Sequence, residues 1–147
     1  MTVPVENTPG VKVFNWNEGR QRNGSSSRVF PMGAKDDPER VCWLQFHYEP
    51  GWVAPVHAHN GWTCTVIMAG SWFANGIEYF PGHIIVVEPN VEYGPFASGP
   101  NGTTAFEIFE NIGACAPIWD ETDPDVQAVL DRLGDSAGSL FNQSIAE

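Results

Sequence analysis

Turn-forming residues interrupt this 147-residue chain at short, regular intervals, and this spacing constrains the fold more than any other feature. Between the turns lie short runs rich in apolar and β-branched residues. The separators are Pro50-Gly51, Asn60-Gly61, Gly70, Asn75-Gly76, Pro81-Gly82 and Pro89-Asn90. Glycine and asparagine tolerate positive φ and proline presets φ near about −65°, so each separator favours a chain reversal. The pattern therefore predicts a mainly β fold, either a sandwich or a barrel.

Six strands are expected between these turns. Their ranges are 41–49, 53–59, 63–69, 72–79, 83–88 and 104–110. After Trp119 the pattern changes, because Asp123 and Pro124 are typical of a helix start and Gly134 of a helix end. Apolar residues between them recur at helical spacing, at positions 126, 129, 130 and 133. We expect one short C-terminal helix that packs on the barrel.

A chain of this length fills one hydrophobic core, so we expect one domain with three parts. Residues 1–40 supply N-terminal strands and a loop, residues 41–119 the core barrel, and residues 120–147 the helix and a tail. The stretch 15–27 is polar and rich in glycine and serine. It is either a lid or a plain connector.

The charge and the cysteine content limit which classes of partner and which cellular location we expect. Seven basic and eighteen acidic residues give a formal net charge of −11, which argues against nucleic acid or an anionic membrane as a partner. The beginning of the sequence lacks the features of a signal peptide, and no apolar run is long enough to span a bilayer. Cys42, Cys64 and Cys115 are odd in number and far apart. A reducing, cytoplasmic location is the expectation.

His57 and His59 form the most informative segment, Gly-Trp-Val-Ala-Pro-Val-His-Ala-His. On a strand, residues at i and i+2 point to the same face. If that face is the interior, two imidazole nitrogens can converge on one metal ion. If it is the exterior, the pair is simply solvated.

The chain resembles the cupin family over about residues 40 to 111. The family's first motif places a glycine, His-x-His, a glutamate and a second glycine at fixed spacing, and Gly51, His57, His59 and Gly70 match it. Thr63, followed by Cys64, takes the place of the glutamate.

The second cupin motif is matched in its framework and altered in its ligand. Pro81-Gly82-His83 is similar to the family's Pro-Gly-Asp, with a histidine in place of the aspartate. The family's metal-binding histidine is replaced by Tyr93, or by Gly94 if the turn is one residue longer. His83 lies where the family has a turn far from the metal, so a surface position is expected.

The resemblance implies a single cupin β-barrel, also called a jelly roll or double-stranded β-helix, that forms a homodimer. It also implies a divalent metal on His57 and His59, with Fe, Mn, Ni and Zn as candidates. Two nitrogen ligands hold such an ion poorly, so a third group is needed. Tyr93 is the positional candidate, and Glu107 and Glu110 are further ones, of which only one faces inward.

A small organic ligand is expected in the barrel. The candidate pocket residues are Gln45, His47, Trp62, Thr63, Thr65 and Phe109. Gln45 and His47 qualify only if their face of the strand, not the face of Leu44, Phe46 and Tyr48, lines the interior. The strand that holds Thr63 and Thr65 has Cys64, Val66 and Met68 on its other face. Both faces are nearly free of polar groups, so we expect both to be covered, by a second sheet or at a subunit interface.

Three functions remain open at this stage. The first is an enzyme in which a metal on His57 and His59 activates a carbonyl- or phenol-type substrate, as a dioxygenase, lyase or isomerase. The second is a metal-free isomerase or cyclase in which His57, His59 and Tyr93 carry protons as catalytic residues. The third is a barrel that binds a small ligand without catalysis.

Overall fold

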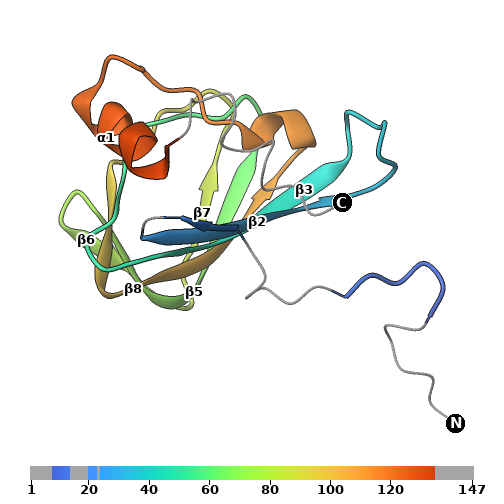
Figure 1. Ribbon diagram of the computed structural model, residues 1–147, viewed down its shortest axis with the longest axis horizontal. Coiled ribbons are helices and arrows are strands. Elements are labelled where there is room, and N and C mark those ends of the chain that lie inside the picture. Colours follow the sequence, from blue (N-terminus) through green and yellow to red (C-terminus); the bar gives the residue numbers. More distant parts are fainter. Residues whose placement is uncertain (1–7, 14–19, 23, 135–147) are drawn as a thin grey trace, which may run out of the picture.

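The structure is a computed structural model that describes residues 8–13, 20–22 and 24–134 of the chain. Its strands are β1 (Arg20–Arg22), β2 (Ser25–Met32), β3 (Val41–Tyr48), β4 (Val53–Ala54), β5 (Thr63–Ala74), β6 (Ile77–Tyr79), β7 (Ile84–Val87) and β8 (Phe96–Phe109). The helices are the 3₁₀ helix η3 (Ile112–Cys115) and α1 (Pro124–Leu133). Figure 1 shows the strands curling together with α1 across one side.

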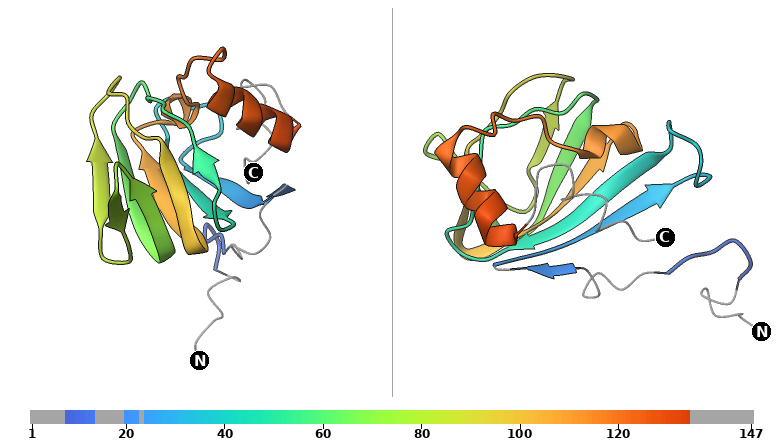
Figure 2. Two further views of the ribbon diagram at one scale, coloured as in Figure 1. Left: turned by 90° about the vertical axis from the view of Figure 1, so that its left-hand side faces the viewer. Right: turned by 45° about the horizontal axis from the view of Figure 1, so that its top comes forward.

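All eight strands belong to one antiparallel sheet with β8 near its middle. The order along the sheet is β1-β2-β3-β8-β5-β6, and β4 and β7 pair in addition with β8 and β5. The sheet is curved, and α1 lies on the side toward which it bends (Figure 2). The predicted mainly β fold with one C-terminal helix is confirmed.

The two faces of the sheet differ in burial as an alternating pattern requires. On β5, Thr63, Thr65 and Ile67 are buried on the inner face, whereas Val66 and Met68 point outward. The core fills the inner face, and its buried members are Val29, Cys42, Leu44, Phe46, Ile67, Trp72, Ala74, Phe96, Ala105, Phe109, Ala114 and Cys115.

Two turn signals had different outcomes. Asn75 and Gly76 form the tight turn between β5 and β6, with φ values of 52° and 75°, as expected of a two-residue hairpin loop. Gly70 was expected to end a strand, and this prediction was wrong, because β5 continues through it to Ala74. The residue lies between two register shifts in the pairing of β5 with β8, so it bends one long strand.

Helix α1 follows its sequence signals. The Asp123 side chain accepts a hydrogen bond from the Asp125 backbone N–H, Pro124 occupies the first turn, and Gly134 ends the helix at a φ of 67°. Val126 and Leu130 are buried beneath it. Of the polar stretch 15–27, residues 15–19 and 23 lie outside the described residues, whereas 20–22 and 25–27 belong to β1 and β2.

Cys42 and Cys115 are joined by a disulfide in this structure, which differs from the expectation of a fully reduced chain. The two residues are 73 positions apart in sequence, and the fold brings β3 next to η3. Cys64 is free. In the described part of the chain, the model contains no helix of sufficient length and hydrophobicity to cross a membrane.

Substitution of Gly70 tests the bend in β5. Gly70 has a φ of 69°, and a Cβ atom there would lie 2.0 Å from the Gly102 carbonyl oxygen. Gly76 has a similar φ of 75°, with no heavy atom within 4 Å of its added Cβ. We expect Gly76→Ala to cost about 1–2 kcal/mol in left-handed strain, and Gly70→Ala to lower the free energy of unfolding by at least twice as much. Urea denaturation followed by tryptophan fluorescence measures both, and equal losses would contradict the close-approach argument.

Candidate metal and substrate site

Backbone hydrogen bonds hold the two histidines of the segment between β4 and β5. His57 N–H donates to the Tyr93 carbonyl at 3.2 Å, and Tyr93 N–H donates back to His57 at 3.0 Å. Ala58 and Ile118 exchange a second pair of bonds, at 2.9 and 2.8 Å. The segment therefore runs extended between two neighbours, and the side chains of His57 and His59 line the same cavity.

Both imidazoles are oriented through their Nδ1 atoms. His57 Nδ1 lies 2.7 Å from the Pro55 carbonyl oxygen, and His59 Nδ1 lies 2.7 Å from that of Ala114. Because a carbonyl oxygen only accepts, Nδ1 carries the proton in each ring and Nε2 of the neutral ring carries a lone pair. His59 Nε2 is buried and has no hydrogen-bond partner. Two imidazoles thus present Nε2 lone pairs to one space.

Burial lowers the pKa of both histidines, and for each it outweighs the opposing effect of the backbone carbonyl. At neutral pH the neutral form is therefore favoured. A neutral imidazole can bind a metal ion or accept a proton.

Glu107 enters the same space from β8. Its Oε1 accepts a hydrogen bond of 2.8 Å from the Tyr93 hydroxyl and lies 3.9 Å from His59 Nε2. Glu110 is exposed, and its Oε2 accepts a hydrogen bond from the Trp62 backbone N–H. The inward-facing glutamate, which the sequence left open, is Glu107.

Burial shifts both members of the Tyr93–Glu107 pair toward their uncharged forms. It is the largest cause that raises the pKa of Glu107. Burial and the neighbouring Glu107 raise the pKa of Tyr93 far above its ordinary value, so the phenol keeps its proton. The pair lies beside His59 Nε2, the buried nitrogen without a hydrogen-bond partner.

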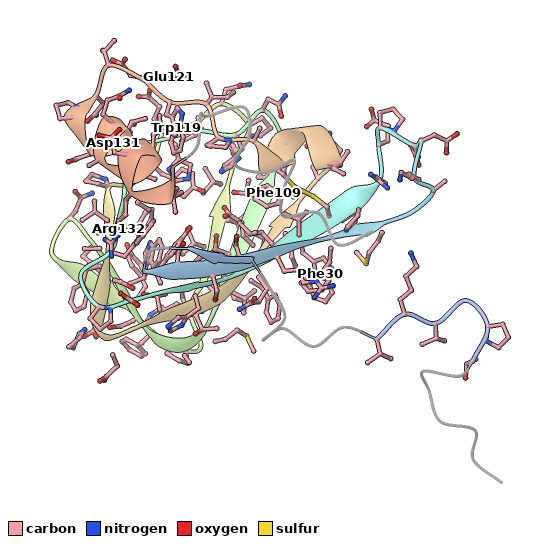
Figure 3. All side chains as sticks on the ribbon, in the orientation of Figure 1. Phe30, Phe109, Trp119, Glu121, Asp131 and Arg132 are labelled. Carbon is pink, nitrogen blue, oxygen red and sulfur yellow. A yellow bond between two sulfur atoms is a disulfide. The ribbon has the colours of Figure 1, made fainter. Side chains whose placement is uncertain are left out.

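The cavity in front of these groups has a volume of about 110 Å³ and lies between the sheet and α1. Its walls come from β2, β3, β8, the histidine segment, the loop after η3 and α1. The lining residues are Ser25, Ser27, Leu44, Tyr48, Trp52, Ala54, Pro55, His57, His59, Glu107, Pro117, Trp119, Val129 and Leu133. Figure 3 shows Trp119 close to α1, on the same side of the sheet as Phe109.

Aromatic rings and an arginine shape one side of this cavity. The rings of Tyr48 and Trp52 stack at 5.0 Å with an interplanar angle of 4°. The Arg132 guanidinium of α1 lies 4.4 Å from the Trp52 ring centroid and 3.9 Å from Glu49 Oε2. These contacts fix α1 as a wall of the cavity, with Arg132 outside its lining. No lysine or arginine is among the described residues that line it.

Gln45 and His47 do not line the cavity. The inner face of β3 carries Leu44 and Tyr48, and both line the cavity. Gln45 and His47 point to the outer face, where His47 Nδ1 lies 2.8 Å from Thr104 Oγ1. The apolar set of this strand took the interior because it gains more from burial.

The other predicted pocket residues are spread over different environments. Trp62 is exposed and does not line the cavity. Thr63 is buried on the inner face, but it is absent from the cavity lining. Thr65 lines a smaller cavity of about 50 Å³ that also borders His57 and Glu107. Phe109 is buried, with its ring centroid 5.0 Å from that of His59.

Several lining residues were not predicted from the sequence. Ser25 and Ser27 lie in the stretch interpreted as a loop, and Trp119 follows η3. Val129 and Leu133 belong to the apolar stripe of α1. The helical spacing of these apolar residues in the sequence predicted that this face of the helix packs on the barrel. His83 lies in the turn before β7, where its Nδ1 accepts a hydrogen bond of 3.0 Å from the Phe80 N–H.

Comparisons with known proteins identify the fold. No family model matches the chain, and no curated protein matches it in sequence. Among solved structures, a Ralstonia eutropha protein of unknown function with a cupin-like fold shares 16% identity, at a TM-score of 0.50. The match covers 75% of this chain and 73% of that one. The chain has the cupin fold.

Two further cupin-fold matches come from proteins with different roles. The polyketide cyclase RemF from Streptomyces resistomycificus is 17% identical at a TM-score of 0.55, over 80% of this chain and 97% of that one. A chain of the complex of Rhodobacter sphaeroides SigE with the anti-sigma ChrR is 17% identical at a TM-score of 0.52. That match covers 65% of this chain and 51% of the other, so this chain spans about half of its length. Such identities establish the fold and not the activity.

Replacement of Glu107 tests the electrostatics of the site in chelator-treated protein. Because the pKa of Glu107 is raised in the folded state, the unfolded chain ionises first as the pH rises. Stability is therefore lost from the ordinary glutamate pKa of about 4.3 upward. We expect Glu107→Gln, which retains an acceptor for Tyr93, to melt a few degrees higher than the wild type at pH 8. At pH 4 the two melting temperatures converge. A difference that does not vary with pH would contradict a raised pKa.

Proposed function

We propose that this cupin is an enzyme that uses a divalent metal ion to act on a small, uncharged molecule bearing a carbonyl or phenolic oxygen. His57 and His59 supply two nitrogen ligands, and Glu107 is the third ligand. The observation that carries the proposal is His59 Nε2, a buried lone pair without a partner, which lies 3.9 Å from the Glu107 carboxylate.

The donor set fits a transition metal in its chemistry. Imidazole nitrogen and carboxylate oxygen each bind such ions at about 2 Å, so two ligand atoms up to about 4 Å apart can share one ion. Two histidines and one carboxylate form a ligand set used by iron in particular. In the described part of the chain, no three His, Cys, Asp or Glu side chains are already arranged as a metal site, so Glu107 has to adjust on binding. A bound cation would favour the ionised carboxylate that burial disfavours.

The residues around the proposed ion have different roles in the reaction. The metal, when bound, would polarise a substrate oxygen as a Lewis acid. Tyr93 holds a proton on its hydroxyl, and Glu107 orients that hydroxyl toward the site. Trp52, Trp119 and α1 form walls of the cavity beside these groups. A lining without lysine or arginine favours an uncharged substrate over an anion.

The cavity volume limits the substrate size. Cavities of roughly 150 Å³ accept benzene in an engineered protein, so about 110 Å³ suits a molecule on the scale of one ring. The stacked rings of Tyr48 and Trp52 offer flat apolar surface for it.

A metal-free isomerase or cyclase is the second candidate. It is favoured by the 2.8 Å hydrogen bond between Tyr93 and Glu107, which forms a proton-bearing pair next to the His59 lone pair. In this case Tyr93 is the acid and His59 the base. The metal content of the purified protein separates the two candidates.

Elemental analysis by plasma mass spectrometry is the test of the metal. We expect about one equivalent of Fe, Mn, Ni or Zn per chain, and its loss in the double variant His57→Ala/His59→Ala. The matched control is His47→Ala/His83→Ala, which also removes two histidines and leaves the cavity intact. Circular dichroism confirms that both variants fold.

Either of two results would contradict the metal proposal. One is wild-type protein that binds no ion even after incubation with each metal. The other is equal metal content in the two double variants. In the first case, loss of activity in Tyr93→Phe would support the metal-free candidate.

A cavity-filling variant tests whether the ligand binds under α1. Val129 lines the cavity, whereas the neighbouring Ala128 is exposed on the same helix. We expect Val129→Phe to weaken binding of catechol or acetylacetone at least tenfold, because the added ring occupies the space, with the metal content unchanged. Ala128→Phe serves as the control and should bind as the wild type does. Isothermal titration calorimetry measures both, and unchanged affinity in Val129→Phe would locate the ligand elsewhere.

A further inference from the structure

A second, smaller cavity borders the polar groups of the candidate site. Its volume is about 50 Å³, and we call it the inner cavity, in contrast to the outer cavity of about 110 Å³. Both cavities are lined by Tyr48, Ala54, His57 and Glu107. The outer cavity is bounded by α1 and the inner cavity by Ile85 of β7, and Figure 2 shows α1 and β7 on opposite sides of the molecule. The two cavities therefore extend in different directions from the same polar groups.

Apolar side chains form much of the wall of the inner cavity. They are Phe46, Trp72, Ile85 and Phe96. The ring centroids of Phe46 and Trp72 are 5.3 Å apart, and those of Trp72 and Phe96 are 5.4 Å apart. The three rings are buried, with exposed fractions of 7% or less. A wall of packed rings favours an apolar occupant over a polar one.

The polar side chains that border the inner cavity already have hydrogen-bond partners. The Tyr93 hydroxyl donates to Glu107 at 2.8 Å, and Thr65 also hydrogen-bonds Glu107. His57 Nδ1 donates to the Pro55 carbonyl oxygen at 2.7 Å. An occupant of the inner cavity therefore gains little from a polar atom of its own. It gains from the apolar surface that it buries, by about fourfold in affinity for each methylene.

The volume of the inner cavity limits the size of its occupant. Because a cavity of roughly 150 Å³ accepts the six carbons of benzene, a volume of about 50 Å³ suits a group of about two carbons. A free molecule of that size would lose more on immobilisation than so few contacts return. The occupant is therefore expected to be a substituent of the molecule held in the outer cavity. Since His57 and Glu107 border both cavities, a substituent next to the substrate oxygen can reach the inner one.

We propose that the inner cavity is a specificity subsite for a short alkyl group next to the carbonyl or phenolic oxygen of the substrate. The substrate class is then a ketone or phenol that bears a methyl or ethyl group on the adjacent carbon. Ile85 closes the inner cavity on the β7 side and determines how long this group can be. The inference rests on the substrate class proposed above and not on the metal, because it requires only that the substrate oxygen lies beside His57 and Glu107.

Binding of catechol and its alkyl derivatives tests the subsite. Isothermal titration calorimetry of the full chain compares catechol with derivatives that carry a methyl, ethyl, propyl or butyl group next to a hydroxyl. We expect Kd to fall by about fourfold for each of the first two carbons, about 15-fold in total, and to rise again from propyl onward. The isomer with its ethyl group one position further from the hydroxyls is the matched control. It has the same apolar surface, directs it elsewhere and should bind as catechol does.

Variants of Ile85 test what limits the length of the alkyl group. Ile85→Ala removes volume from the wall, so we expect the tightest binding to shift from the ethyl to the propyl or butyl derivative. Ile85→Phe fills the inner cavity, so the gain from the ethyl group should disappear while the affinity for catechol itself is unchanged. Ile84→Ala and Ile84→Phe are the matched controls, because Ile84 precedes Ile85 on β7 and is 62% exposed. Circular dichroism confirms folding, and Ile85→Ala decides the question if Ile85→Phe does not fold.

The other outcomes separate this inference from the proposed function. If catechol binds and its alkyl group has no effect, or if the folded Ile85 variants retain the preference for ethyl, the subsite is contradicted and the proposed function stands. Equal gains from the two ethyl isomers would indicate a general preference for apolar molecules, which also contradicts the subsite. If no compound of the series binds, the proposed substrate class is wrong and the subsite is overturned with it.

Discussion

Strand β8 makes backbone hydrogen bonds with β3 and β4 along one edge and with β5 along the other, and the remaining elements are arranged around it. This double pairing fixes which of its side chains point inward. It places Phe109 in the core and Glu107 in the site, two residues apart on one face. The close approach of Gly70 to Gly102 lets β5 bend along β8 without losing contact.

The site that results is built from groups whose pKa values burial shifts toward their uncharged forms. The lowered pKa values of His57 and His59 and the raised values of Tyr93 and Glu107 share one main cause, which is removal from water. Backbone carbonyls orient both imidazoles, and these bonds arise from the main chain and not from other side chains. The metal ion of the proposed site would add a positive charge among these groups.

The fold was predictable because its signals are local. Asn75-Gly76 determines a tight turn by its own backbone preferences, and Asp123-Pro124 determines a helix start. The cupin resemblance rested on spacings of glycine and histidine that are local as well, and the structural matches confirm the fold. The wrong prediction for Gly70 arose because its bend depends on contact with Gly102, a strand far away in sequence.

The site was predictable only where two residues lie close in the sequence. His57 and His59 share a segment, so their common orientation followed from spacing. The inward position of Glu107 depends on register between strands, which one sequence does not contain. The face on which Gln45 lies could not be read from the sequence for the same reason, since the choice between the two faces of β3 is made by the whole core.

The pairing of β5 with β8 explains how the altered cupin motif can still supply a carboxylate to the cavity. Thr63 stands where the family has a glutamate, and its partner on β8 is Phe109. The next inward pair is Thr65 and Glu107, so a carboxylate enters the same cavity from the adjacent strand. Tyr93, at the position of the family's histidine, then donates its hydrogen bond to that carboxylate. In the proposed site, replacements on two strands thus compensate each other and retain an acid and a proton donor beside the two histidines.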